Sequence, residues 1–344
     1  MREPLADLTE RVATHVLERD VLAEDWEKGV AIQGLLATDQ HVDEAQELVD
    51  LAIRTQTSNG QFAFGWGDYP KSWLDRTDFL SDYKPCFNQT VLGDCALRFY
   101  QRTGDERYLD AAEDHYEFLQ TTPRTADGGM SHRRDSVELW VDALYFVVPF
   151  LARYGAITGD RAAMDEAATQ LRIHTKHLQD PHTGLFRHNW RETPNSYPQG
   201  TFWARGVGWA TTALVDALAI LPDDHPQRDD LCSILDETVS TLVELQDASG
   251  FWHHILDDAD TLRSPLETSG TLMFAYTIER GVQLRVLDDS LSDVAARALD
   301  AATWVVDERG AVRRVAKKPG GPGAPLGVTS FGQGWFLLAA DLFS

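Results

Sequence analysis

The sequence predicts an all-α fold, an (α/α)6 barrel of six inner and six outer helices, built as a single domain over residues 1–344. Three observations favour this class. Helical periodicity recurs along the whole chain, whereas strand-like alternation is rare. Charged amphipathic segments alternate with apolar segments rich in small residues. The starts of the apolar segments lie 52 to 64 residues apart, which indicates a repeated pair of helices.

The amphipathic segments are the predicted outer helices. A helix with one apolar face buries that face and leaves the opposite one in water, so such segments fit an outer layer. They lie near residues 5–19, 41–56, 105–120, 160–178, 227–246 and 290–306.

The apolar segments are the predicted inner helices, because a helix that is apolar nearly all round must be covered on every side. They lie near residues 26–37, 87–101, 138–155, 203–221, 267–283 and 331–342. Six inner helices surrounded by six outer ones close into a barrel. The alternative, an open α-solenoid, more often has repeats of about 34–47 residues and a polar cap.

Polar side chains gather at the predicted mouth of the barrel, where the loops that enter the inner helices converge. Asp142 lies in the apolar stretch ELWVDALYF, close to Trp140 and, as we expect, about one turn inside a helix. Burying an unpaired carboxylate costs several kcal/mol, so an acid at this place indicates a function. The candidate site residues are Trp26, Asn88, His132, Trp140, Asp142, His188, Arg205 and Trp209.

This set of side chains suits a sugar that carries a carboxylate. Flat apolar sugar faces pack on Trp rings, and an Arg side chain binds a carboxylate through a planar fork of two donors. An acid held among aromatic rings has a raised pKa, so we expect Asp142 to keep a proton and donate it. The histidines can orient sugar hydroxyls or tune that acid.

Each candidate also has a structural interpretation. A single Asp at the start of a helix is more often an N-cap than a catalyst. The tryptophans can be core packing, and His132 and His188 can be satisfied loop residues. Arg205 can form a structural ion pair with Glu192 or Glu267. The functional interpretation is favoured because separate repeats place these groups at one end of the barrel.

Charge and apolar patterning exclude several classes of protein. The chain has 54 acidic residues against 31 Lys and Arg, a net charge of −23, and the acids are dispersed. Nucleic acid would be repelled, and dispersed acidity favours a solvated surface suited to high salt, as in a halophile. The first twenty residues have no signal-peptide apolar core, and no apolar run reaches the ~18 residues of a membrane span. We therefore expect a cytoplasmic protein with no membrane partner.

The motifs predict neither a metal nor a cofactor. No HExxH or paired-cysteine spacing occurs, and the glycine patterns that cradle phosphate are absent. The tract KKPGGPGAPLG at 317–327 looks like a glycine-rich loop, but its prolines remove backbone donors. We expect it to be a flexible loop beside the mouth that acts as a lid.

Several segments together resemble the unsaturated rhamnogalacturonyl hydrolases of glycoside hydrolase family 105. The resemblance spans most of the chain. Its specific parts are WVDALYFVVPF at 140–150 and FWARGVGW at 202–209, in order and correctly spaced; DWEKGV at 25–30, LRFYQRTGDERYLDAA at 97–112, TGLFRHNW at 183–190 and LETSGTLMFAYTIERGV at 266–282 add to it. The family fold is an (α/α)6 barrel, which agrees with the helix pattern.

The resemblance implies a single catalytic domain that removes a 4,5-unsaturated uronic acid, galacturonyl or glucuronyl, from the non-reducing end of small lyase-generated oligosaccharides. The family protonates C4 of the double bond and adds water at C5, without a metal or redox cofactor. Asp142 matches the family's general acid and base. The residues that match its substrate contacts are His132, Trp140, His188, Arg205 and Trp209, and Trp26 matches an aromatic position.

One departure from the family concerns Asn88, which stands where the family has a second functional Asp. An amide can hold a hydroxyl but cannot take a proton, so a scheme with two carboxylates is disfavoured. Asp75, Asp78 and Asp82 are nearby in sequence and are candidates to substitute. Two further hypotheses stay open: a sugar isomerase or epimerase that uses His188 and His254, and a glycan-binding protein without catalysis, suggested by Asn88.

Overall fold

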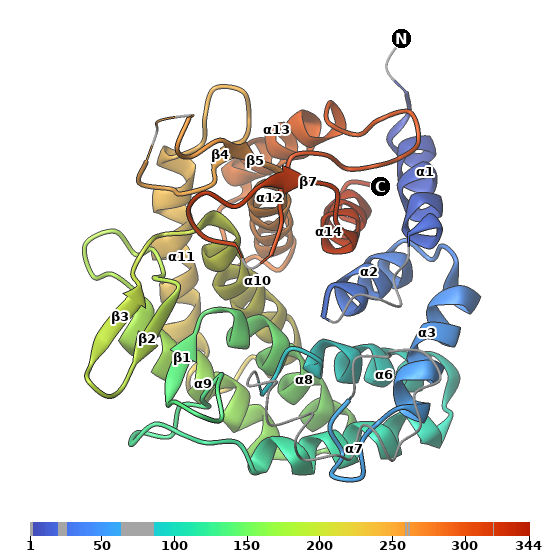
Figure 1. Ribbon diagram of the computed structural model, residues 1–344, viewed down its shortest axis with the longest axis vertical. Helices are drawn as coiled ribbons and strands as arrows, with labels where there is room; N and C mark the ends of the chain where they lie inside the picture. The colour runs from blue at the N-terminus through green and yellow to red at the C-terminus, as the bar shows by residue number, and fades with distance from the viewer. Residues whose placement is uncertain (1–2, 20–25, 63–85, 259, 261, 319) are drawn as a thin grey trace.

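The computed structural model of the protein describes residues 3–19, 26–62, 86–258, 260, 262–318 and 320–344. Inner helices form a ring in which each packs against the next and the last packs against the first (Figure 1). They are α2 (Trp26–Ala37), α6 (Thr90–Thr103), α8 (Asp142–Thr158), α10 (Ala204–Ile220), α12 (Thr268–Gln283) and α14 (Ser330–Asp341). The closed ring confirms the predicted barrel and rules out the open solenoid.

Outer helices lie against this ring, each packed on an inner neighbour (Figure 1). They are α1 (Leu5–Glu18), α3 (Val42–Arg54), α7 (Glu106–Gln120), α9 (Arg161–Leu178), α11 (Arg228–Glu244) and α13 (Ser292–Thr303). Their burial follows the predicted amphipathic pattern: α3 buries Ala45, Val49 and Ala52 on one face, whereas α10 buries every residue from Ala204 to Leu218. A short 3-10 helix, η2 (Asp289–Leu291), precedes α13.

The start of the third inner helix differs from the prediction. Residues 138–140 form a strand, β1 (Glu138–Trp140), and α8 begins only at Asp142. β1 pairs antiparallel with β2 (Asn189–Arg191), which pairs with β3 (Ser196–Gln199). A short apolar run does not distinguish a strand from a buried helix. Asp142 is therefore the first helical residue and does not lie one turn inside the helix.

Two further hairpins lead into inner helices in the same way as β1 and β2. β4 (Trp252–His253) pairs with β5 (Leu266–Glu267) directly before α12. β6 (Val315–Ala316) pairs with β7 (Leu326–Gly327) just before α14. These hairpins fix the loops at the mouth of the barrel.

A buried carboxylate ties three inner helices together away from the mouth. Asp94 on α6 accepts hydrogen bonds of 2.7 Å from Arg98 Nε, from Arg153 Nε on α8 and from Gln33 Nε2 on α2. Burial raises the pKa of Asp94, but the charges of Arg153 and Arg98 outweigh burial and hold that pKa well below its usual range. Asp94 is thus ionised and fully paired.

No helix of the described residues is long and apolar enough to cross a membrane.

We predict that Asp94→Ala lowers the free energy of unfolding by about 3 kcal/mol, because the partly buried guanidinium groups of Arg98 and Arg153 lose their partner. A lowered carboxyl pKa stabilises the fold above the ordinary pKa, and this stabilisation is lost on acidification. The difference from the wild type should therefore narrow below a pH of about 4. Urea unfolding over a pH series measures both effects.

The matched control is Asp223→Ala, which removes an exposed carboxylate paired with Arg228 at 3.3 Å and should leave unfolding almost unchanged. Equal losses for the two variants would contradict the structural role of Asp94.

Candidate active site

Strand pairing brings His188 to Asp142. The backbone N–H of Val141 donates to the carbonyl oxygen of His188 at 2.9 Å, and His188 Nε2 lies 3.3 Å from Asp142 Oδ2. Only 2% of the His188 side chain is exposed, against 17% of the Asp142 side chain. The carboxyl group therefore lies beside a buried imidazole while one side of it stays open to a ligand.

Trp140 lies between two histidines. Its ring stacks on His132 with centroids 4.6 Å apart and planes 14° apart. It meets the His188 ring edge-on, with centroids 5.2 Å apart and planes at 77°. The predicted site residues His132, Trp140, Asp142 and His188 thus form one cluster. Burial lowers the pKa of His132 to about 4, against the opposing charge of Asp142, so His132 is neutral at neutral pH.

The indole of Trp203 contacts both His188 and Arg205. The Trp203 ring centroid is 4.8 Å from that of His188 and 4.2 Å from the Arg205 guanidinium carbon. Arg205 Nη1 donates to the carbonyl oxygen of Ala316 at 2.7 Å and to Ser269 Oγ at 3.2 Å. Burial lowers the pKa of Arg205 to about 10, so it remains charged at neutral pH.

The structural ion pairs considered for Arg205 are not formed within the described residues. Glu267 instead caps α12, with its carboxylate accepting from the backbone N–H groups of Ser269 and Gly270. Glu192 accepts from the backbone N–H of Ala126. The Arg205 charge therefore stays available to an anion.

Aromatic rings form the floor beneath these groups. Trp26 lies 5.5 Å from Trp209 and 4.9 Å from Phe331, whose ring also contacts the Arg205 guanidinium at 4.8 Å. Trp209 has no exposed surface and packs on Tyr145 and Phe146 as well. The structure therefore places both predicted tryptophans under the mouth, with Trp209 packed into the floor.

Asn88 lies next to the histidine cluster through its neighbours in the chain. The backbone N–H of Cys86 donates to the His132 carbonyl oxygen at 2.8 Å, and the Phe87 ring lies 6.2 Å from that of His132. The structure thus supports Asn88 as a residue of the mouth. Asp75, Asp78 and Asp82 lie outside the described residues.

The predicted rise in the pKa of Asp142 is wrong for the site as it stands. Burial does raise this pKa, but the contact and charge of His188, followed by the charges of His132 and Arg205, outweigh burial. The pKa of Asp142 is therefore lowered. Sequence reasoning took Trp140 as an apolar wall and did not place three basic side chains around the carboxyl group.

Several buried polar atoms of the site have no hydrogen-bond partner within the described residues. Leaving such an atom unpaired costs about 1–3 kcal/mol each, so a cluster of them marks a surface that binds polar ligand atoms. They are Asp142 Oδ2, both ring nitrogens of His188, His132 Nδ1, Arg205 Nε and the indole nitrogens of Trp203 and Trp209.

Sequence reasoning left Trp203 out of the candidate site. Its ring contacts both His188 and His254, with centroids 4.8 and 6.5 Å away. His254 Nε2 donates to the carbonyl oxygen of Gly321 at 2.6 Å, so this nitrogen is already engaged within the protein. The FWARGVGW segment contained the signal, because Trp203 stands two residues before Arg205.

The glycine-rich loop lies against the mouth. A side chain at Gly320 would collide with the Trp203 ring, and Lys318 Nζ lies 2.8 Å from Glu27 Oε1. The predicted position beside the mouth is confirmed, and movement as a lid stays a prediction.

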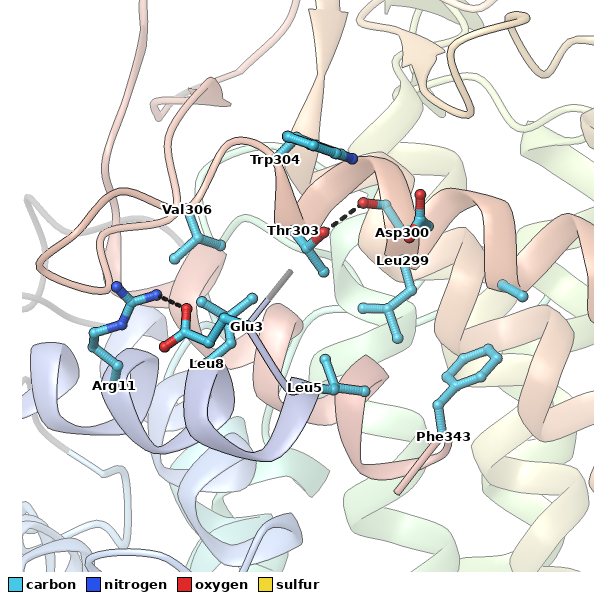
Figure 2. Close-up of a pocket in the computed structure, with 11 residues that line it drawn as sticks. Glu3, Leu5, Leu8, Arg11, Leu299, Asp300, Thr303, Trp304, Val306 and Phe343 are labelled. Atoms are coloured by element: carbon cyan, nitrogen blue, oxygen red, sulfur yellow. Dashed lines mark hydrogen bonds and ion pairs between the residues drawn. The ribbon is translucent and has the colours of Figure 1, made fainter. Parts of the chain in front are cut away.

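A cavity of about 710 Å³ lies elsewhere, between α1 and α13 (Figure 2). Its wall includes Leu5, Leu8, Leu299 and Phe343, and it contains none of the site residues. Figure 2 shows mostly apolar side chains with the Arg11–Glu3 pair at one edge. We therefore place the chemistry at the barrel mouth.

No group of His, Cys, Asp or Glu suited to a metal occurs within the described residues.

Known proteins share the whole length of this fold. The family model of Glycosyl Hydrolase Family 88 matches residues 7–341. The unsaturated rhamnogalacturonyl hydrolase YesR of Bacillus subtilis is 28% identical over 323 residues, which cover 91% of this chain and 85% of that protein. The unsaturated 3S-rhamnoglycuronyl hydrolase of an Alteromonas species is 28% identical over 259 residues, 70% of this chain and 62% of that protein.

Among solved structures, a glycoside hydrolase from family 105 of C. acetobutylicum superposes with a TM-score of 0.82 at 23% identity, covering 98% of each chain. This likeness agrees with the (α/α)6 barrel described above.

We predict that His188→Ala raises the pKa of Asp142, because the variant removes the strongest lowering contact and leaves burial to dominate. A 13C NMR titration of labelled Asp carboxyl groups measures this pKa, and Asp142→Asn identifies the signal. His225→Ala, which removes the partner of surface Asp165, should leave the Asp142 signal unmoved. An unshifted Asp142 pKa in His188→Ala would contradict the prediction.

Proposed function

Because the chain belongs to Glycosyl Hydrolase Family 88 and is a glycoside hydrolase, we propose that it removes a 4,5-unsaturated uronic acid from the non-reducing end of a small oligosaccharide. The names of the two curated relatives support unsaturated uronides as the substrate class. The observation that carries the proposal is the partly open Asp142 carboxyl group beside His188, with the unpaired Arg205 Nε in the same cluster.

Arg205 binds the uronate carboxylate in this proposal. Its Nη1 is held by Ala316 and Ser269, so the guanidinium plane is fixed before substrate arrives. Nε has no partner among the described residues, which leaves the Nε edge of the guanidinium for a two-donor contact with a carboxylate. The Trp203 ring packed on the guanidinium keeps this donor edge away from bulk water.

Asp142 donates its proton to C4 of the double bond, and the positive charge that develops at C5 is shared with the ring oxygen. Water adds to C5 and returns a proton to the Asp142 carboxylate. The resulting hemiketal opens to a ketone at C5 and leaves a hemiacetal at C1. Collapse of that hemiacetal breaks the glycosidic bond, which releases the shortened sugar and a keto-uronate with an aldehyde at C1. Asp142 thus serves as general acid and then as general base.

Substrate binding supplies the protonated form of Asp142. In the protein alone, His188 and Arg205 hold the pKa of Asp142 low. A bound uronate offsets the Arg205 charge and adds a like charge near the carboxyl group, and both changes raise the pKa of Asp142. His188 then stabilises the carboxylate that forms when the proton leaves.

We predict that Asp142→Asn lowers kcat by roughly 10²–10⁴-fold, because the amide cannot donate or take the proton. The loss of ultraviolet absorbance of the C4=C5 double bond measures turnover on unsaturated disaccharides from pectin, ulvan and glycosaminoglycan lyases. The thermal unfolding midpoint should stay close to that of the wild type, because Asp142 Oδ2 has no aligned hydrogen bond to lose.

No absorbance loss with wild-type protein on any of these substrates would overturn the proposed function. Saturable binding of an unsaturated disaccharide without turnover would instead identify a glycan-binding protein. Interconversion of mannose or N-acetylhexosamines would identify an isomerase or epimerase, which the hydrogen bond from His254 Nε2 to Gly321 disfavours.

We predict that Arg205→Lys raises KM roughly tenfold or more, because a Lys ammonium cannot reproduce the planar fork that binds a carboxylate. The same variant should bind an amidated uronide about as well as the wild type does, since that ligand carries no carboxylate. Arg313→Lys, which changes an exposed Arg paired with Asp307, serves as the control. Unchanged KM in Arg205→Lys would place the carboxylate elsewhere.

A further inference from the structure

A buried carboxylate behind the site, that of Glu138, holds Trp140. Glu138 Oε2 accepts the indole N–H of Trp140 at 2.8 Å, and only 2% of Glu138 is exposed. Burying a carboxylate is costly unless hydrogen bonds compensate for it. Three further donors do so: Arg191 Nη2 and Nε at 2.6 and 2.8 Å, and Ser136 Oγ at 2.9 Å.

The backbone of Glu138 also fixes His132. Its carbonyl oxygen accepts the backbone N–H of His132 at 2.8 Å, and its own N–H donates to Ser131 Oγ at 3.0 Å. One residue therefore determines where the His132 backbone lies and how the Trp140 ring is turned.

The angle of the Trp140 ring matters because the ring contacts both histidines. Its face lies on His132 and its edge on His188, and His188 in turn contacts Asp142. A rotation of the indole would lose the stack on His132 and push against His188. The Trp140 indole makes one hydrogen bond within the described residues, and that bond ends on Glu138.

We propose that Glu138 is a positioning residue for the proposed hydrolysis: its carboxylate orients Trp140 and thereby holds His132 and His188 around Asp142. This inference rests on the proposed function for its effect on turnover. The orientation of Trp140 by Glu138 is testable without any activity. Glu138 itself neither touches the substrate nor exchanges a proton with it.

The kinetic test compares Glu138→Ala, Trp140→Phe and the double variant. Phe keeps an aromatic ring on His132 but lacks the N–H group. We expect each single variant to lower kcat roughly 10- to 100-fold, as for a small misplacement of catalytic groups, with a smaller change in KM. The double variant should be no slower than the slower single variant, because both changes remove the same hydrogen bond.

Glu138→Gln should recover most of the activity lost in Glu138→Ala, because its amide oxygen still accepts the indole N–H. The matched control is Glu166→Ala on α9, a carboxylate paired with Arg124 at 2.6 Å, which should leave kcat and KM unchanged. Wild-type kcat in Glu138→Ala, or losses that multiply in the double variant, would overturn the proposal.

Hydrogen exchange of the indole N–H groups in 15N-labelled tryptophan provides a readout that needs no substrate. The signal missing from Trp140→Phe identifies Trp140, and its exchange should be slow in the wild type and at least tenfold faster in Glu138→Ala. If the wild type turns over no unsaturated uronide but shows this change, the proposed function fails while the positioning of Trp140 stands. Equal exchange rates in the two proteins would overturn the positioning role itself.

Discussion

The pairing of β1 with β2 is the constraint on which the candidate site depends. Trp140 is in register with Asn189, and Val141 is bonded to the carbonyl oxygen of His188. Residues almost fifty positions apart in the chain therefore meet at the first turn of α8. A shift of one residue would turn these side chains to opposite faces and separate His188 from Asp142. The barrel holds the inner helices in place, and the pairing of β1 with β2 places His188 beside Asp142.

Two carboxylates of the barrel, the buried Asp94 and the partly exposed Asp142, show that hydrogen-bond pairing distinguishes a structural acid from a functional one. Asp94 accepts from three side chains and is committed to joining helices. Asp142 Oδ2 lies 3.3 Å from His188 Nε2, but it accepts no hydrogen bond within the described residues. A carboxylate whose oxygens all accept hydrogen bonds stabilises the fold. An oxygen without a hydrogen bond can still gain one from a ligand, and that bond then favours binding. Glu138 resembles Asp94 because its carboxylate is buried and hydrogen-bonded to several side chains. It resembles Asp142 because it lies at the candidate site.

Periodicity was sufficient to predict the barrel, because an inner helix must be apolar all round and an outer one must not. The site was predictable as a set of residues but not as a geometry. The strand at 138–140 was missed because three residues are too few to show the alternation of a strand, and the apolar residues that follow them fit a buried helix. The direction of the Asp142 pKa was missed because it depends on His188 and Arg205, which come from other repeats. Glu267 was considered as an ion-pair partner of Arg205, yet its carboxylate caps α12.

Asn88 fits a reaction that needs only one acid. Ordinary glycoside hydrolysis uses one carboxyl group for the leaving group and a second for water or the sugar carbon. Hydration of a vinyl ether consumes one proton at C4 and releases one from the water that adds at C5. Asp142 can supply the first and collect the second if it remains near both carbons. The histidines and Trp140 around Asp142 then matter more than a second carboxylate. They hold the Asp142 carboxyl group close enough for both proton transfers, to C4 and from the water that adds at C5.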